Sequence, residues 1–128
     1  MKRGLTGQVQ GKILIVDDNE DFASILEAML DFEGYQVRTA RDARDGYLAF
    51  ALFRPDLVIT DIQMPGKSGL ELIKDIRTQN PEVRTIYMSG DPGRFRTEIE
   101  EEMKRHRARL LQKPFSAVDL RDLLAGLL

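Results

Sequence analysis

Short runs of consecutive apolar residues recur along the chain, separated by longer stretches in which apolar positions follow a helical period. The runs at residues 13–16, 57–59 and 86–88 are too short for helices and are typical of strands buried on both faces of a sheet. Residues 36–39 alternate between apolar and polar side chains, and residues 109–112 are only half apolar. These two segments are therefore predicted to form the edges of the sheet.

The stretches between the strands carry apolar residues at helical spacing, and capping or breaking residues mark their ends. Asp42 is predicted to cap the second helix, and Ser116 with Asp119 to form a capping box for the last. The pair Asn80–Pro81 is predicted to end the third helix. The predicted apolar faces are Phe22, Ile25, Leu26, Met29 and Leu30; Tyr47, Leu48 and residues 50–53; Leu70, Ile73 and Ile76; Phe95, Ile99 and Met103; and Leu120, Leu123, Leu124 and Leu127.

Five strands, each followed by a helix, predict an α/β fold, a doubly wound five-stranded parallel sheet with right-handed crossovers. Because the second and fifth strands are the less apolar ones, the predicted order is 2-1-3-4-5, in a flavodoxin-like three-layer α/β/α arrangement. Residues 1–10 are expected to be a loose lead-in, and residues 11–128 to form one domain. The fourth helix has only a narrow apolar stripe, so a small displacement of it is expected to cost little.

Composition restricts the possible classes of function. Of the 128 residues, 42% are apolar and 31% are charged, which is ordinary for a globular protein. The chain has no cysteine, which excludes disulfides and thiolate metal sites. A net charge of −2 with dispersed basic residues argues against direct nucleic-acid binding. No apolar run is long enough for a membrane span or for a signal peptide behind Lys2 and Arg3, so we expect a cytoplasmic protein.

Polar residues follow four of the five predicted strands at the point where each strand ends. Asp17 and Asp18 follow the first strand, Asp61 the third, Ser89 the fourth and Lys113 the fifth. In an open α/β sheet these ends converge on the crevice where the strand order reverses, which is the usual ligand site. The five side chains are therefore predicted to lie together.

The charges of this predicted cluster favour a divalent cation. Three carboxylates about 4 Å apart would repel by about 4 kcal/mol per pair at an effective dielectric constant of about 20, so a cation is needed for all three to stay ionised. Oxygen-only ligands suit Mg²⁺, which keeps waters and accepts phosphate oxygens as further ligands. Zinc is disfavoured because the chain has no cysteine and its one histidine, His106, lies in a different segment. A cation, an ammonium and a hydroxyl around one carboxylate could stabilise a phosphoryl group in transfer.

Four sequence motifs strengthen this interpretation. In chain order they are ILIVDDNED, LVITDIQMPGKSGLEL, TIYMSG and LLQKPF. Together they resemble the receiver domain of two-component response regulators, and the resemblance covers residues 11–127. It implies a signalling protein that catalyses only its own aspartyl phosphorylation and dephosphorylation, with Mg²⁺ as cofactor. The partners it implies are a sensor histidine kinase or histidine phosphotransfer protein and a downstream protein or fused output domain.

The resemblance also implies a role for each site residue. Asp61 would accept the phosphoryl group, and Ser89 and Lys113 would hold its oxygens. The implied metal ligands are Asp18 directly, Asp17 largely through water, Asp61, and the backbone carbonyl of Gln63. The family also implies a cis peptide bond between Lys113 and Pro114.

One position departs from the family pattern. Family members usually carry Tyr or Phe three residues before the lysine, whereas this chain has Leu110. Leucine has no ring to swing inward, so we expect it to pack as an aliphatic residue beside the fourth strand and fourth helix. Activation is then expected to pass through residues 89–91 and the fourth helix.

Other interpretations stay open at this point. Asp17 and Asp18 could cap the first helix, which would leave Asp61 and Lys113 unexplained. The main alternative is a receiver-like interaction module that does not depend on phosphorylation. The presence of all five polar residues at the strand ends argues against it, whereas Leu110 argues for it. A phosphatase with an Asp nucleophile is a third class; its haloacid-dehalogenase-like form needs a second Asp where Asn19 stands.

Overall fold

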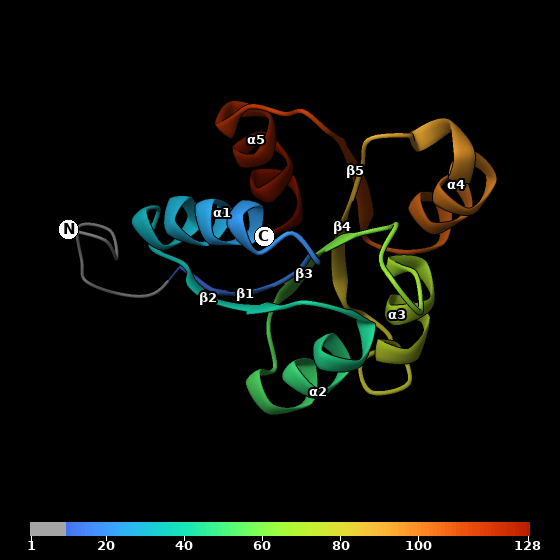
Figure 1. Ribbon diagram of the computed structural model, residues 1–128, viewed down its shortest axis with the longest axis horizontal. Helices are drawn as coiled ribbons and strands as arrows, with labels where there is room; N and C mark the ends of the chain where they lie inside the picture. The colour runs from blue at the N-terminus through green and yellow to red at the C-terminus, as the bar shows by residue number, and fades with distance from the viewer. Residues whose placement is uncertain (1–9) are drawn as a thin grey trace.

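The computed structural model describes residues 10–128, and its centre is a five-stranded parallel sheet (Figure 1). The strand order β2-β1-β3-β4-β5 confirms the predicted 2-1-3-4-5 order, with the two less apolar strands at the edges. The strands are β1 (Lys12–Val16), β2 (Gln36–Ala40), β3 (Leu57–Asp61), β4 (Arg84–Ser89) and β5 (Ala108–Gln112).

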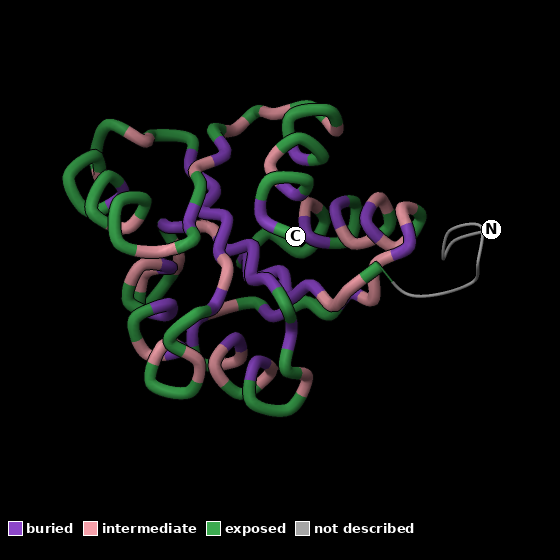
Figure 2. Tube along the Cα trace, turned by 180° about the vertical axis from the view of Figure 1, so that it is seen from behind, coloured by how far each residue is buried: buried purple, intermediate pink, exposed green. Residues whose placement is uncertain are grey.

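Helices cover both faces of the sheet. The helical elements are α1 (Glu20–Phe32), α2 (Ala43–Phe53), α3 (Gly69–Ile76), the short 3-10 helix η1 (Pro92–Phe95), α4 (Arg96–Arg105) and α5 (Ala117–Leu127). Apolar side chains of α1 and α5 share one buried cluster with the sheet, and those of α2, α3 and α4 share the other. The strands between these layers are the most deeply buried part of the chain (Figure 2).

Capping residues position the helices that follow the strands. Asp42 caps α2, and Ser116 with Asp119 forms the capping box of α5, as predicted. The cap of α1 is Asn19, whose side chain accepts a hydrogen bond from the backbone N–H of Phe22. The alternative in which Asp17 or Asp18 caps this helix is therefore wrong; Asp17 instead accepts a hydrogen bond from the backbone N–H of Asn19 at 2.9 Å.

The predicted end of the third helix and several predicted apolar positions need correction. Helix α3 ends at Ile76, before the predicted stop at Asn80–Pro81, because turns take over: the N–H and hydroxyl of Thr78 both donate to the carbonyl of Asp75. Four large side chains of the predicted apolar faces are exposed instead: Ile25 by 69%, Leu48 by 54%, Leu52 by 88% and Met103 by 37%.

The described chain begins at the last residue of the predicted lead-in. The predicted loose lead-in at residues 1–10 lies almost wholly outside the described residues. Gln10 is described, and its N–H donates to the carbonyl of Gly34 at 2.8 Å. Within residues 10–128, none of the helices has the length and apolar character that crossing a bilayer requires.

Candidate functional site

Three carboxylates meet where β1 and β3 end. Asp17, Asp18 and Asp61 each present a carboxylate oxygen, and these oxygens lie within 4.8 Å of one another. The two strands are neighbours in parallel register, with Val16 opposite Thr60, so the residues that follow them emerge side by side. Asp17 is 1% exposed, whereas the exposed Asp18 lies at the rim.

Lys113 brings a positive charge to the same place from the end of β5. Its ammonium donates to Oδ2 of Asp17 at 3.0 Å and lies 3.6 Å from Oδ2 of Asp61. The backbone N–H of Lys113 donates to the carbonyl of Ser89 at 2.8 Å, which joins this loop to the end of β4. The Lys113–Pro114 peptide bond is cis, as predicted.

Asp61 experiences opposing electrostatic effects. Burial raises the pKa of its carboxyl most strongly, Lys113 lowers it, and the charges of Asp17 and Asp18 raise it again. The net result is a pKa above the usual value for aspartate. A cation among the three carboxylates would remove the repulsion, because opposite charge favours the ionised form.

Ser89 is the last residue of β4. It is buried, and its hydroxyl oxygen accepts a hydrogen bond from the N–H of Asp91 at 3.0 Å. This bond uses an oxygen lone pair, so the hydroxyl proton can still be donated. The Ser89 hydroxyl is thus tied to the loop that leads into η1.

The segment after Asp61 is shaped by close backbone contacts. Gln63 is exposed in the loop between β3 and α3. The Thr60 hydroxyl donates to the carbonyl of Asp61 at 2.9 Å. A Cβ atom at Gly69 would lie 2.1 Å from that same carbonyl oxygen, so only glycine allows this approach. The sequence reasoning missed Thr60, although a hydroxyl directly before Asp61 was a usable signal.

An aromatic ring contacts the lysine of the site, and the sequence did not predict this contact. The Lys113 ammonium lies 4.5 Å from the ring centroid of Phe22. Phe115 meets the Phe22 ring edge-on, with centroids 5.8 Å apart and an interplanar angle of 88°. The sequence shows Phe22 on the apolar face of α1, which explains its packing but not its contact with the lysine.

Leu110 is half-buried and packs on the α2–α4 side, as predicted. Its register partner on β4 is Tyr87, which is fully buried on the same side. The Tyr87 hydroxyl donates to Oε1 of Glu102 on α4 at 2.5 Å. An aromatic residue therefore does lie beneath α4, but it comes from the neighbouring strand.

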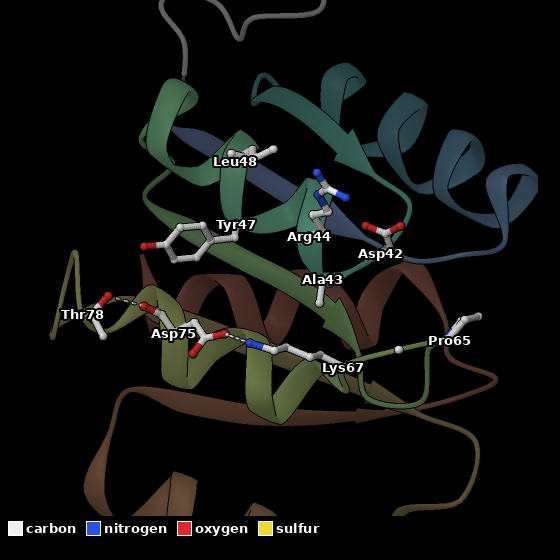
Figure 3. A pocket seen from close by; sticks show the side chains of 10 residues that line it. Asp42, Ala43, Arg44, Tyr47, Leu48, Pro65, Lys67, Asp75 and Thr78 are labelled. Carbon is white, nitrogen blue, oxygen red and sulfur yellow. Dashed lines mark hydrogen bonds and ion pairs between the residues drawn. The ribbon is translucent and has the colours of Figure 1, made fainter.

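A separate pocket of about 730 Å³ lies between α2 and the β3–α3 loop (Figure 3). Tyr47 and Ala43 line one side, and Pro65 and Lys67 line the other. Lys67 reaches along α3 to Asp75, with Nζ 2.7 Å from Oδ2. None of the predicted site residues lines this pocket, so it is distinct from the carboxylate cluster.

A parallel 2-1-3-4-5 sheet with an acidic cluster and a lysine at the carboxyl ends of its strands is the arrangement of a receiver-type signalling module. The chain belongs to the response regulator receiver domain family, whose model matches residues 13–125. It is a response-regulator signalling module of the two-component systems. This family assignment confirms the resemblance found in the sequence motifs.

Known proteins of this family support the assignment. The nitrogen assimilation regulatory protein NtrX of Azorhizobium caulinodans is 43% identical over 108 residues, which are 82% of this chain and 23% of that protein. The chain thus spans about a quarter of the length of this relative. The chemotaxis protein CheY4 of Vibrio cholerae has a TM-score of 0.82 at 26% identity, over 94% of this chain and 99% of that one. The response regulator TrrA of Thermotoga maritima, solved with Mg²⁺ and BeF, has a TM-score of 0.79 at 30% identity, over 91% and 98% of the two chains.

Proposed function

We propose that this chain accepts a phosphoryl group on Asp61 and that the resulting aspartyl phosphate switches its signalling state. The observation that carries the proposal is the position of Asp61 among two further carboxylates and the Lys113 ammonium, 3.6 Å away. This set combines a nucleophile with groups that can hold the charge of a phosphoryl group. We place the receiver domain at residues 11–128.

The donor set fits Mg²⁺. The three carboxylate oxygens lie within 4.8 Å of one another, and Asp18 and Gln63 are exposed at the rim, where waters could complete the coordination. The residues that would hold the ion are Asp17, Asp18 and Asp61 through their carboxylates and Gln63 through its backbone carbonyl. When bound, Mg²⁺ neutralises charge on the carboxylates and on the phosphoryl oxygens.

The chain's own residues supply the nucleophile and the charge stabilisation. A carboxylate oxygen of Asp61 attacks the phosphorus of a phosphohistidine, a P–O bond forms, and the P–N bond breaks with its electron pair returning to the histidine nitrogen, which takes up a proton. Lys113 lies close enough to transfer its hydrogen bond from Asp17 to a phosphoryl oxygen. The hydroxyl of Ser89 can donate to another oxygen while keeping its bond from Asp91. Hydrolysis of the aspartyl phosphate by water resets the site.

The partners follow from this chemistry. The donor is a sensor histidine kinase or a histidine phosphotransfer protein in the cytoplasm, and the chain catalyses only its own phosphorylation and dephosphorylation. The recipient of the signal is a downstream protein or a fused output domain. New contacts of Ser89 and Lys113 with the phosphoryl group exist in one state only, and such differential contacts can shift a conformational equilibrium.

Phosphorylation by a small donor tests the proposal directly. Incubation with acetyl phosphate and Mg²⁺ should add one phosphoryl group, detected as a single mass increment that maps to Asp61, with release of acetate. Asp61→Asn should abolish the increment, and EDTA should suppress it. The matched control is Asp56→Asn, which changes an exposed aspartate just before β3. Undiminished labelling of Asp61→Asn, or labelling that EDTA leaves unchanged, would contradict the proposal.

A further inference from the structure

Among residues 10–128, the Lys113 ammonium contacts an aromatic ring as well as two carboxylates. Oδ2 of Asp17 lies at 3.0 Å, Oδ2 of Asp61 at 3.6 Å, and the ring centroid of Phe22 at 4.5 Å. A cation within about 6 Å of a ring centroid is attracted by the negative face of the ring. The contact is partly shielded from water, because only 26% of the Lys113 side chain is exposed.

Two contacts fix the position of Phe22, one through its backbone and one through its ring. Its backbone N–H donates to the capping side chain of Asn19 at 3.1 Å, which fixes the first turn of α1 next to the carboxylates. Phe115, two residues after Lys113, meets the ring edge-on, and both rings pack against the apolar cluster under α1 and α5. The ring therefore links α1 to the loop that carries the lysine.

We propose that Phe22 is a positioning residue, which holds the Lys113 ammonium at the mouth of the site for phosphoryl transfer to Asp61. The inference rests on the proposed function. Lysine has a flexible four-carbon side chain and three rotatable donors, so its ammonium needs restraint to act at one place. Asp17 supplies a directional bond, and the ring supplies a second contact that has no single hydrogen-bond direction.

A ring suits this position better than a polar group. An attraction to a ring face has no single hydrogen-bond direction, so the ammonium can turn from Asp17 toward a phosphoryl oxygen while staying over Phe22. A further carboxylate at the same place would compete with the phosphoryl group for the ammonium. The ring also excludes water from that side, which strengthens the remaining charge interactions.

The first arm of the test is spectroscopic and uses the unphosphorylated protein. Protons of the Lys113 side chain next to the ammonium should show an upfield ring-current shift in NMR spectra. Phe22→Leu should remove this shift, and Phe22→Tyr should retain it. Identical Lys113 shifts in the wild type and Phe22→Leu would overturn the inference.

The second arm measures phosphorylation of Asp61 by acetyl phosphate with Mg²⁺. Phe22→Leu should lower the rate constant roughly threefold to fivefold, as expected for loss of a partly exposed cation–π contact, while Mg²⁺ affinity in an NMR titration stays unchanged. Phe22→Tyr, which keeps a ring, should restore the rate. Met29→Ala removes a partly buried side chain from the same helix and cluster, and its rate should equal that of the wild type.

The outcomes separate this inference from the proposed function. A wild-type rate in Phe22→Leu, or an equal loss of rate in Met29→Ala, would overturn the positioning role while Asp61 is still labelled. Absence of any label on the wild-type protein would instead overturn the proposed function. The full pattern of a lost ring-current shift, a slowed reaction and rescue by tyrosine supports the inference.

Discussion

The two faces of the sheet hold their helices in different ways. Under α1 and α5, apolar side chains pack between the helices and the sheet, from Ile13 on β1 to Leu127 at the end of α5, and the ion pair of Arg121 with Glu33 is more exposed, at 58% and 32%. Under α4 a polar network crosses the interface: Tyr87 donates to Glu102, and Arg77 donates to both carboxylate oxygens of Glu102 at 2.6 and 3.0 Å. The first face depends on buried area, which is non-directional, and the second adds hydrogen bonds that require one geometry.

The polar network restrains α4 more than an apolar stripe alone would. The sequence predicted that only one narrow apolar stripe anchors α4. That prediction is wrong, because Tyr87 and Arg77 also hold the helix through Glu102. Arg77 and Glu102 have side chains only 14% and 18% exposed, so their ion pair is partly shielded from solvent. A helix held by directional bonds favours discrete positions over a gradual slide. The α4 network is thus a candidate element for a two-state response, whereas α1 packs through apolar contacts without such a network.

The largest effect should come from opening the apolar face. Leu26→Ala removes a side chain that is 2% exposed on α1, and should lower the free energy of unfolding by about 2–5 kcal/mol through lost burial and a residual cavity. Urea denaturation followed by circular dichroism measures this change. Leu52→Ala, at a position 88% exposed on α2, is the matched control and should stay within about 0.5 kcal/mol of the wild type. A loss below 1 kcal/mol for Leu26→Ala would contradict the dependence of this face on buried area.

Breaking the polar network should cost less. Glu102→Gln keeps the shape of the side chain but weakens the bidentate bond from Arg77, and should lower the free energy of unfolding by about 1–3 kcal/mol. Tyr87→Phe removes only the hydroxyl and should cost about 0.5–1.5 kcal/mol. In the double variant the two losses should not add, because both changes act on one carboxylate. Strict additivity in urea denaturation would show that the three side chains do not act as a unit.

The pH dependence of the unfolding free energy tests the contribution of the Glu102 charge. Burial alone would raise the pKa of the Glu102 carboxyl, but hydrogen bonds from Arg77 and Tyr87 outweigh it and hold the pKa below its usual value. Its ionised form therefore stabilises the fold above the unfolded-state pKa of about 4.3, and this contribution is lost as the pH falls through the lower folded-state pKa. The difference in unfolding free energy between the wild type and Glu102→Gln should shrink between pH 7 and pH values below about 4. A difference that is constant with pH would contradict this account.

The smallest effect is local and leaves global stability nearly unchanged. Binding of beryllofluoride with Mg²⁺ should change amide hydrogen exchange at residues 89–104 more than in α1, since Ser89 is bonded to the loop that leads into η1 and α4. Tyr87→Phe should enlarge the change in α4, because it removes one of the bonds that hold this helix. Protection changes that omit residues 89–104 altogether would rule out a signal that travels through this loop and helix.

Much of the fold and of the candidate site could be predicted from sequence pattern because their cause is local or topological. Continuous apolar runs identify buried strands, less apolar ones identify the edges, and parallel strands place Asp17, Asp61 and Lys113 at one end of the sheet. The cap at Asp42 and the box at Ser116 follow from short-range hydrogen bonding. These features depend on residue type and order, which a sequence states directly.

Contacts between side chains on different elements were decided only by the tertiary structure. Glu102 and Arg77 are 25 residues apart and meet because α4 packs beside the end of α3, and no periodicity encodes that meeting. The ring of Phe22 satisfies the apolar pattern of α1 equally well with or without a lysine on its face. Asn19 and Asp17 are both good capping residues. Packing at the end of β1 buries Asp17, and Asn19 caps α1. Pattern selects which face of an element is buried, whereas the identity of the neighbour depends on how the elements assemble in three dimensions.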